Sequence, residues 1–228
     1  MGVLSMRMSK YGNALTILLV ILIVAVIIGV GFLIYNYIIK PKINSDNAME
    51  AIAEFDRNIE ENNEEQVEGT PVTDDNNISG IGNQNDNVKK KTYYKGFVML
   101  GYITIPKTNV KQPILDTVTP DSLNTAVAVL YPSNPQLNQP GNVVIIGHNY
   151  RNGQFFSDND KLSVGDKILI KDNSGQELTY TIYQKFQTSE QDTSFYTRDT
   201  KGAIEITLST CTDDSKERII ILARVEEN

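Results

Sequence analysis

The chain of 228 residues is acidic, with a net charge of −7 and a pI near 4.8. Because it has no basic stripe that could neutralise phosphate groups, binding to nucleic acid is not expected. It contains one cysteine and one histidine, which excludes an intrachain disulfide and is too few for a zinc ligand set.

An uncharged, apolar stretch lies near the N-terminus, at residues 11–39. About 20 apolar residues span a bilayer as a helix, so residues 14–39 are predicted to form a transmembrane signal anchor. A cleaved signal peptide is the alternative, but its apolar segment would be shorter, and no cleavage site with small residues follows. Basic residues are nearly equal in number on the two sides of this stretch, so the positive-inside rule does not decide its orientation. Residues 1–13 are placed in the cytoplasm because a long acidic segment follows the anchor.

Residues 40–91 are dominated by asparagine, glutamate and aspartate. Low hydrophobicity combined with high net charge is typical of disorder, so this segment is predicted to be an acidic, disordered linker. A short helix at 48–59 is an alternative, because the apolar residues there are loosely periodic. The expected role is that of a spacer between the membrane and a folded domain.

The folded domain is predicted over residues 92–228. Eight strand-like segments are separated by turns rich in proline, glycine and asparagine, and the only helical signal is a brief turn at 120–124. Many short strands with little helix indicate a closed or nearly closed β-barrel. The strands are expected at 101–106, 110–115, 126–131, 142–147, 166–171, 177–186, 203–210 and 217–225.

The only cysteine follows an apolar strand near the C-terminus. The strand predicted at 203–210 alternates between apolar and polar residues, and Cys211 falls on the polar side. A structural cysteine would more naturally lie on the apolar side, although a lone cysteine is commonly a small buried hydrophobe. Both an inert and a reactive thiol therefore stay open from this pattern alone.

Arg218 and His148 are placed to act together with a reactive thiol. In simple hairpin register, Arg218 faces Cys211 with Cβ atoms about 5 Å apart, and a fixed positive charge favours thiolate and stabilises a developing oxyanion. His148 follows the strand predicted at 142–147, where functional side chains are often presented. Taken singly, Arg218 would be a solvated edge residue and His148 a structural one. Together, the three form a nucleophile, a proton-transfer group and an oxyanion stabiliser.

These residues resemble the signature of the sortases, the membrane-anchored cysteine transpeptidases of Gram-positive bacteria. The similarity rests on Thr-Leu-Ser-Thr-Cys at 207–211, Arg218 at the start of the last strand, and the Gly-His pair at 147–148 that closes an earlier apolar strand. It covers residues 96–225. The sortase class is left open. Ser209 makes the motif similar to that of class B sortases, whereas the connection at 187–201 is short for the helix-bearing insertion of that class.

The resemblance implies a fold, a reaction and partners. The fold is expected to be mainly β, an eight-stranded sortase-like barrel with short helices, and the catalytic domain is expected outside the cell membrane. Cys211 is expected to attack a Leu-Pro-x-Thr-Gly-like sorting signal, Arg218 to stabilise the oxyanion, and His148 to transfer protons. The resulting thioester would carry a surface protein to the amine of a peptidoglycan precursor or of a pilin.

Ser209, Thr210 and Asn149 flank the nucleophile and the histidine, and they are predicted to bind the substrate. No cofactor is expected; some sortases bind calcium through acidic residues of the folded domain, but no such set can be assigned in this sequence. Two other functions stay open. A membrane-anchored cysteine peptidase would use the same cysteine with water as the acceptor, and a non-catalytic β-barrel binding module would not need Cys211.

Overall fold

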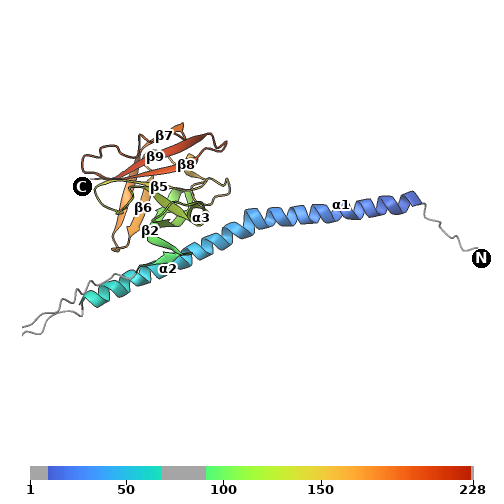
Figure 1. Cartoon of the computed structure of the whole chain (residues 1–228), viewed down its shortest axis with the longest axis horizontal. Coiled ribbons are helices and arrows are strands. Elements are labelled where there is room, and N and C mark those ends of the chain that lie inside the picture. The colour runs from blue at the N-terminus through green and yellow to red at the C-terminus, as the bar shows by residue number, and fades with distance from the viewer. Residues whose placement is uncertain (1–9, 68–90, 227–228) are drawn as a thin grey trace, which may run out of the picture. The chain divides into compact units, whose positions relative to one another are not determined.

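The structure is a computed structural model that describes residues 10–67 and 91–226 (Figure 1). The chain divides into two compact units, Met1–Ile43 and Asn44–Asn228. The first unit contains an apolar helix, and the second contains a β-barrel together with a helix packed on it.

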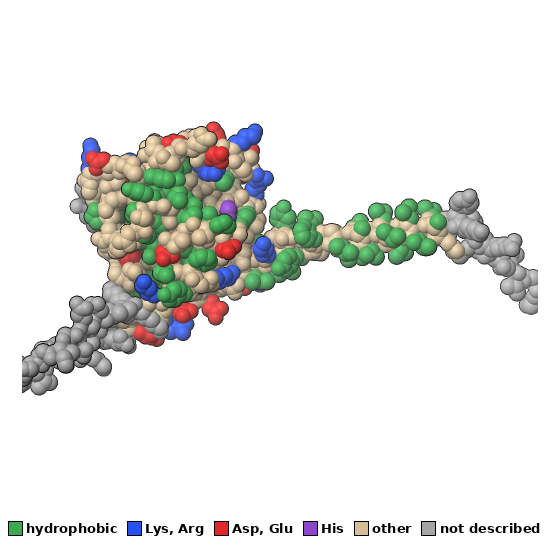
Figure 2. Space-filling view, in the orientation of Figure 1, with side chains coloured by type: hydrophobic (Ala, Val, Ile, Leu, Met, Phe, Trp, Pro, Cys, Tyr) green, Lys and Arg blue, Asp and Glu red, His purple; other side chains and the backbone are tan. Residues whose placement is uncertain are grey.

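The apolar helix is α1 (Lys10–Ile34), which continues through a π-helical turn at Tyr35–Ile39. Its large hydrophobic side chains are exposed along its whole length, and Figure 2 shows one face of this apolar surface. Among the described residues, this is the one helix that is long and apolar enough to cross a membrane. A helix that is apolar on every face is typical of a membrane span. The apolar helix predicted at 14–39 is therefore present, and it could serve as an anchor.

Eight strands close into a barrel, because β6, at the end of the sheet order, pairs with β2 as well as with β7. All eight predicted strands are present, so the mainly β, closed fold is confirmed. The short strand β1 (Tyr93–Tyr94), which pairs with the start of β2, was not predicted. Strand β7 also extends further than predicted, to Ser189. The order around the barrel is β2 (Phe97–Ile105), β3 (Val110–Leu115), β4 (Val127–Tyr131), β5 (Gly141–Ile146), β8 (Ile204–Cys211), β9 (Glu217–Val225), β7 (Glu177–Ser189) and β6 (Lys167–Asp172).

Little helix lies between the strands of the barrel itself, within residues 91–226. Helix α3 (Pro120–Leu123) begins at a capping box in which Thr119 and Ser122 bond reciprocally, which satisfies two donors at the helix start. Single 3₁₀ turns occupy Pro106–Thr108 and Asn159–Lys161. The helical turn predicted at 120–124 is confirmed.

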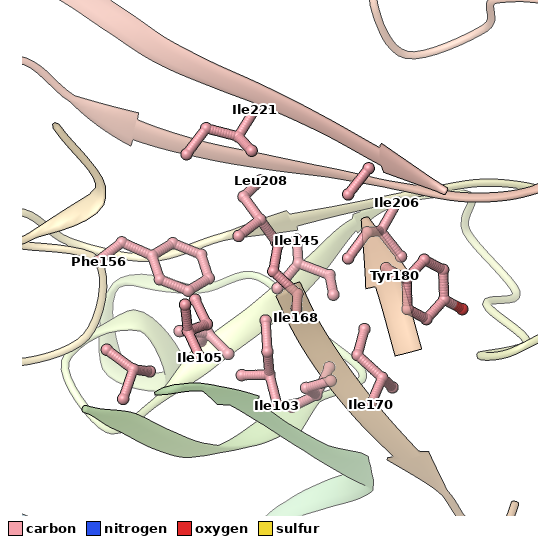
Figure 3. Packing of buried hydrophobic residues seen from close by; sticks show 14 of the residues in the cluster. Ile103, Ile105, Ile145, Phe156, Ile168, Ile170, Tyr180, Ile206, Leu208 and Ile221 are labelled. Atoms are coloured by element: carbon pink, nitrogen blue, oxygen red, sulfur yellow. The ribbon is translucent and has the colours of Figure 1, made fainter. Parts of the chain in front are cut away.

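The barrel interior is filled by aliphatic and aromatic side chains from alternate strand positions (Figure 3). The alternation follows from the two-residue period of a strand, which points every second side chain inward. Fully buried members include Ile103, Ile105, Ile145, Phe156, Ile168, Ile170, Ile206, Leu208 and Ile221.

Helix α2 (Lys40–Val67) replaces the disordered linker predicted at 40–91, and that prediction was wrong for residues 40–67. Ala48, Ile52, Phe55 and Ile59 recur at helical spacing and are buried, so they form the apolar stripe that docks a helix. The acidic composition concealed the stripe because most other positions of the helix are polar. The rest of the predicted linker, residues 68–90, lies outside the described part of the chain.

The stripe of α2 packs on the start of the barrel. Ile52, Phe55 and Ile59 form one cluster with Met99 and Tyr102 of β2. The rings of Phe55 and Tyr102 meet edge to face, with centroids 6.1 Å apart, an arrangement that aromatic pairs prefer. The docked helix thus covers apolar side chains that a bare barrel would expose.

Polar contacts accompany this packing. Lys171 Nζ lies 2.8 Å from an Asp56 carboxylate oxygen, and the Asn58 amide donates to the Thr92 hydroxyl at 2.9 Å. The second pair is buried, so its polar groups need the bond they make. These contacts fix the register of α2 on the barrel.

The outward face of β8 is covered as well. Its polar residues Glu205, Thr207 and Ser209 are all less than 10% exposed. The long connection between β7 and β8 lies over them, and its Phe195 packs on Val144 and the outer face of β9. The predicted alternation of β8 is confirmed, but its polar face does not meet solvent.

Candidate active site

Two parallel strands bring the histidine and the cysteine to one edge of the barrel. Strands β5 and β8 pair in parallel, with Ile146 opposite Ser209. Because parallel strands end on the same side, the residues that follow β5 lie beside the end of β8. The backbone N–H of Gly147 donates to the Ser209 carbonyl, and the Thr210 hydroxyl donates to the Gly147 carbonyl at 2.7 Å.

Gly147 allows this close approach. A Cβ atom at Gly147 would lie 2.9 Å from side-chain atoms of both Phe156 and Val127. Such contacts are too short for real side chains, so the residue before His148 must be small for the loop to pack on the barrel. The Gly-His pair noted in the sequence therefore has a steric reason.

Cys211 and Arg218 face each other across the last hairpin. The ladder of β8 and β9 pairs Cys211 directly with Arg218, as the spacing predicted, and pairs Glu205 with Arg224. The turn between them is closed by bonds between Thr212 and the backbone of Glu217. Arg224, the second arginine of β9, therefore lies at the opposite end of the strand from the cysteine.

Arg218 has one carboxylate neighbour in the described chain. Its guanidinium lies 3.4 Å from a Glu190 oxygen and also donates to the Glu217 carbonyl at 3.3 Å. Both contacts are long for charge-assisted hydrogen bonds. The arginine thus keeps donors that are free to meet a developing negative charge.

His148, Cys211 and Arg218 line one pocket of about 280 Å³. The three residues singled out in the sequence are therefore brought together, although they come from two strands and a loop. The pocket has apolar walls from Leu123, Leu130, Ile146, Phe195 and Tyr196, and polar groups from Glu190, Asp192, Ser209 and Thr210.

Burial lowers the pKa of His148 below its ordinary value of 6.5, because removal from water disfavours the charged imidazolium. The ring packs against that of Tyr150, with centroids 4.9 Å apart. At neutral pH the imidazole is therefore mainly uncharged, and in that state one ring nitrogen can accept a proton.

The three predicted substrate-binding residues have different surroundings. Ser209 and Thr210 line the pocket, although the Thr210 hydroxyl is already used by the Gly147 carbonyl. Asn149 instead holds the site together: its amide donates to the Cys211 carbonyl at 3.1 Å and to the Asp213 carboxylate at 2.9 Å. Asn149 thus ties the histidine loop to the turn after the cysteine.

The pocket wall formed by the β7–β8 connection was not predicted. The sequence marks residues 187–201 only as a short connection, and only the aromatic pair Phe195 and Tyr196 could have signalled a buried role. The Asn142 amide holds this pair by donating to both backbone carbonyls, at 3.0 and 3.1 Å. The connection is therefore a fixed part of the pocket.

A buried polar cluster anchors the same connection. The Arg198 guanidinium forms an ion pair with Glu205 and donates to the Asn142 amide oxygen at 3.0 Å. The Tyr183 hydroxyl donates to Glu205 at 2.9 Å, and the Thr207 hydroxyl donates to Asn142 at 2.8 Å. A buried charge needs partners of this kind, so the cluster explains why the outward face of β8 is polar.

No group of three or more histidine, cysteine, aspartate or glutamate side chains that could hold a metal ion occurs within residues 10–67 and 91–226. The acidic residues at the pocket have other partners: Glu190 contacts Arg218, and Asp192 accepts bonds from Thr188 and Ser194. The chemistry available at the pocket is that of a thiol, an imidazole and a guanidinium.

Comparison with known proteins identifies relatives of this chain. The sortase domain family model matches residues 103–226. Sortase A of Bacillus anthracis is 30% identical over 126 residues, which is 54% of this chain and 58% of that protein. The chain thus matches a little over half the length of this curated relative.

Solved structures share the fold. A sortase D5 transpeptidase of Clostridium perfringens aligns with a TM-score of 0.57 and 24% identity, over 80% of this chain and 99% of that one. Sortase C-1 of Actinomyces oris aligns with a TM-score of 0.51 and 22% identity, over 56% of this chain and 74% of that one. Since the family model spans more than half of the chain, the chain belongs to the sortase family.

Proposed function

We propose that this chain cleaves a Leu-Pro-x-Thr-Gly-like sorting signal and transfers the fragment on the amino-terminal side of the scissile bond, as an acyl group, to an amine through a thioester on Cys211. The observation that carries the proposal is the meeting of Cys211, His148 and Arg218 in one pocket. A nucleophile, a proton-transfer group and a fixed positive charge are the parts that acyl transfer requires.

In the first half-reaction the Cys211 sulfur attacks the carbonyl carbon before the scissile bond. His148 accepts the thiol proton, which its uncharged state at neutral pH permits. Arg218 stabilises the negative charge that forms on the carbonyl oxygen. The tetrahedral intermediate then collapses, the C–N bond breaks, and His148 gives the proton to the leaving amine. The product is a thioester between the substrate and Cys211.

In the second half-reaction an incoming amine attacks the thioester carbon. His148 takes the proton that the amine loses, and Arg218 again faces the oxyanion. The C–S bond then breaks, and His148 gives its proton to the Cys211 sulfur to restore the thiol. The proposed acceptor is the amine of a peptidoglycan precursor or of a pilin. Protons and bonds balance without any cofactor.

The pocket has a size and lining that suit a short extended peptide. A volume of about 280 Å³ holds a few side chains rather than a folded domain. Its apolar wall, which includes Leu123, Leu130 and Phe195, suits the leucine and proline of the proposed signal. The walls therefore select the sequence, while the three polar residues carry out the reaction.

The proposed location is the cell membrane, with a single pass through α1. In this topology the N-terminus is cytoplasmic and the barrel is outside, where surface proteins and wall precursors meet. The apolar helix supports an anchor, and the sortase membership supports the outer location of the barrel.

Intact mass spectrometry of the full chain in detergent micelles tests the function. The chain is incubated with a panel of sorting-signal peptides, with and without hydroxylamine or triglycine. We expect an acyl adduct on the only cysteine, its disappearance in Cys211→Ala, and a product joined to the added amine. Hydrolysed peptide alone, even with excess amine, would favour a peptidase. The absence of any adduct or product would contradict the catalytic proposal.

A further inference from the structure

The His148 ring is held without hydrogen bonds. Within residues 10–67 and 91–226, neither ring nitrogen of His148 makes a hydrogen bond or an ion pair. A histidine that moves protons is ordinarily oriented by a bond from one ring nitrogen to a carboxylate or a carbonyl. Some other contact must fix the direction of this imidazole, because its terminal torsion is otherwise broad.

That contact is the ring of Tyr150, two residues further along the chain. The imidazole and phenol rings have centroids 4.9 Å apart and an interplanar angle of 32°. The Tyr150 ring also lies 5.7 Å from the ring of Phe155, which is only 2% exposed. The Tyr150 ring thus packs against both the His148 ring and a buried core residue.

Tyr150 is itself held at both ends. Its hydroxyl donates to the Asn124 side-chain oxygen at 2.8 Å, and its backbone N–H donates to the Ser157 hydroxyl at 3.0 Å. Asn124 is the C-cap of α3, where its own N–H bonds to the Pro120 carbonyl. The tyrosine therefore connects the histidine loop to an element on the neighbouring β3–β4 connection.

We propose that Tyr150, held by Asn124, is the positioning residue that keeps the imidazole of His148 directed at Cys211 for proton transfer. The inference rests on the proposed role of His148. Tyr150 does not line the Cys211 pocket, so it acts on the histidine and not on the substrate. Its exposure of 40% also shows that it is not needed as a core residue.

Three substitutions distinguish the effect of the Tyr150 ring from that of its hydrogen bond to Asn124. Tyr150→Ala removes the ring that packs on His148. Tyr150→Phe and Asn124→Ala leave the ring and remove only the bond between the hydroxyl and the amide oxygen. Tyr93→Ala is the matched control, because Tyr93 is also an exposed tyrosine, at 55%, and lies in β1, outside the pocket lining.

Kinetics of transpeptidation by the full chain in micelles give the first readout. For Tyr150→Ala we expect kcat to fall about 10- to 100-fold, the scale of a misplaced reacting group. We expect KM to stay within about twofold, since no substrate contact is removed. Tyr150→Phe and Asn124→Ala should each lower kcat by about two- to fivefold, and the double variant no further, because both break the same bond.

Nuclear magnetic resonance of histidine-labelled chain gives a readout that does not depend on turnover. The chain has one histidine, so its ring signals are unambiguous. Removal of the Tyr150 ring exposes the imidazole, so the midpoint of its titration should rise toward 6.5 in Tyr150→Ala and stay low in Tyr150→Phe. The other titratable groups around the same pocket are Cys211, Arg218, Glu190, Asp192 and Tyr196.

The outcomes distinguish this inference from the proposed function. A Tyr150→Ala variant that keeps the kcat and the His148 titration of the parent chain would overturn the inference and leave the function standing. Equal losses in Tyr150→Ala and Tyr93→Ala, with an unchanged titration, would also overturn it, because a general loss of stability would explain both. If His148→Ala keeps full activity, the proposed role of His148 fails and the inference fails with it.

Discussion

Cys211 and Arg218 are direct partners in the antiparallel ladder of β8 and β9. Opposed residues of this kind have Cβ atoms about 5 Å apart, and both side chains line the same pocket. The Arg218 side chain is 28% exposed, and its carboxylate neighbour Glu190 is 3.4 Å away. The guanidinium thus belongs to the pocket that the cysteine lines and is not neutralised by a close ion pair.

Removal of this guanidinium should impair acyl transfer. We expect Arg218→Ala to lower kcat/KM by about 10²–10³-fold, the usual cost of losing an oxyanion donor. Arg218→Lys should recover only part of the loss, because an ammonium lacks the planar fork of the guanidinium. Steady-state kinetics with a sorting-signal peptide measure both.

Arg224→Ala is the matched control for this experiment, because Arg224 is on the same strand but pairs with Glu205. It should keep kcat/KM close to the parent value. Equal losses in Arg218→Ala and Arg224→Ala would show that the effect comes from strand β9 as a whole.

The acid side of the activity profile should report His148. Burial lowers the pKa of this imidazole from 6.5, so it stays uncharged down to a pH below 6.5. As the pH falls through the lowered pKa, the imidazole gains a proton and can no longer accept one from Cys211. We therefore expect kcat/KM to hold near neutral pH and to decline with a midpoint below 6.5. A midpoint above 6.5 would contradict the assignment.

The buried polar cluster that holds the β7–β8 connection should affect substrate affinity. In Glu205→Gln the Arg198 guanidinium loses its ion pair. Because the Arg198 side chain is 19% exposed, we expect the free energy of unfolding to fall by about 2–3 kcal/mol, less than for a fully buried pair. The pocket wall at Phe195 and Tyr196 then loosens, and we expect KM to rise. Alkylation of Cys211 by iodoacetamide, which needs no pocket wall, should keep its rate.

Lys201→Gln is a control for that variant, because Lys201 is an exposed charge at the far end of the same connection. It should change neither KM nor the denaturation midpoint. If Glu205→Gln leaves KM unchanged while stability falls, the polar cluster supports the fold and does not shape the pocket.

Helix α2 should be needed for a stable barrel. A chain that begins at residue 92 loses the burial of Ile52, Phe55 and Ile59, each worth about 1.5–3 kcal/mol before the entropy of ordering the helix is subtracted. We expect its free energy of unfolding to be lower by about 3–5 kcal/mol than that of a chain beginning at residue 44. Urea denaturation followed by circular dichroism measures the difference.

Single substitutions check the same point in the full chain. Phe55→Ala should destabilise the barrel unit, because Phe55 is 2% exposed and large-to-small changes of buried phenylalanines cost about 3–5 kcal/mol. The exposed neighbour Glu54 provides the control Glu54→Ala. Equal stability of the two variants would mean that the docked helix contributes little.

The local patterns of the strands predicted much of the site. The alternation of β8 and the spacing to Arg218 predicted the Cys211–Arg218 pair because hairpin register is a local property. The position of His148 beside them depended on the parallel pairing of β5 with β8. That contact joins segments far apart in sequence, so the strand pattern placed His148 only at a strand end, and residue type and the resemblance to sortases joined it to the other two.

Other features could not be predicted from local patterns. Helix α2 was expected only as a short alternative helix at 48–59, which lies inside the observed Lys40–Val67, because its apolar stripe is narrow and includes alanine and the average hydrophobicity of the segment resembles that of a linker. The burial of Glu205 depends on Arg198 from a loop, and the tethering role of Asn149 depends on the carbonyl of Cys211. Partners of this kind are set by tertiary contacts that a strand pattern does not contain.

The parallel pairing of β5 with β8 also has a consequence for folding. A parallel pair requires a crossover, and here β6 and β7 lie between β5 and β8 along the chain. Contacts between distant segments form slowly because loop-closure entropy is lost before they stabilise the chain. We therefore expect the nucleophile to meet its histidine late in folding, and a chain in which β5 and β8 are not paired to carry a thiol that is chemically present but catalytically silent.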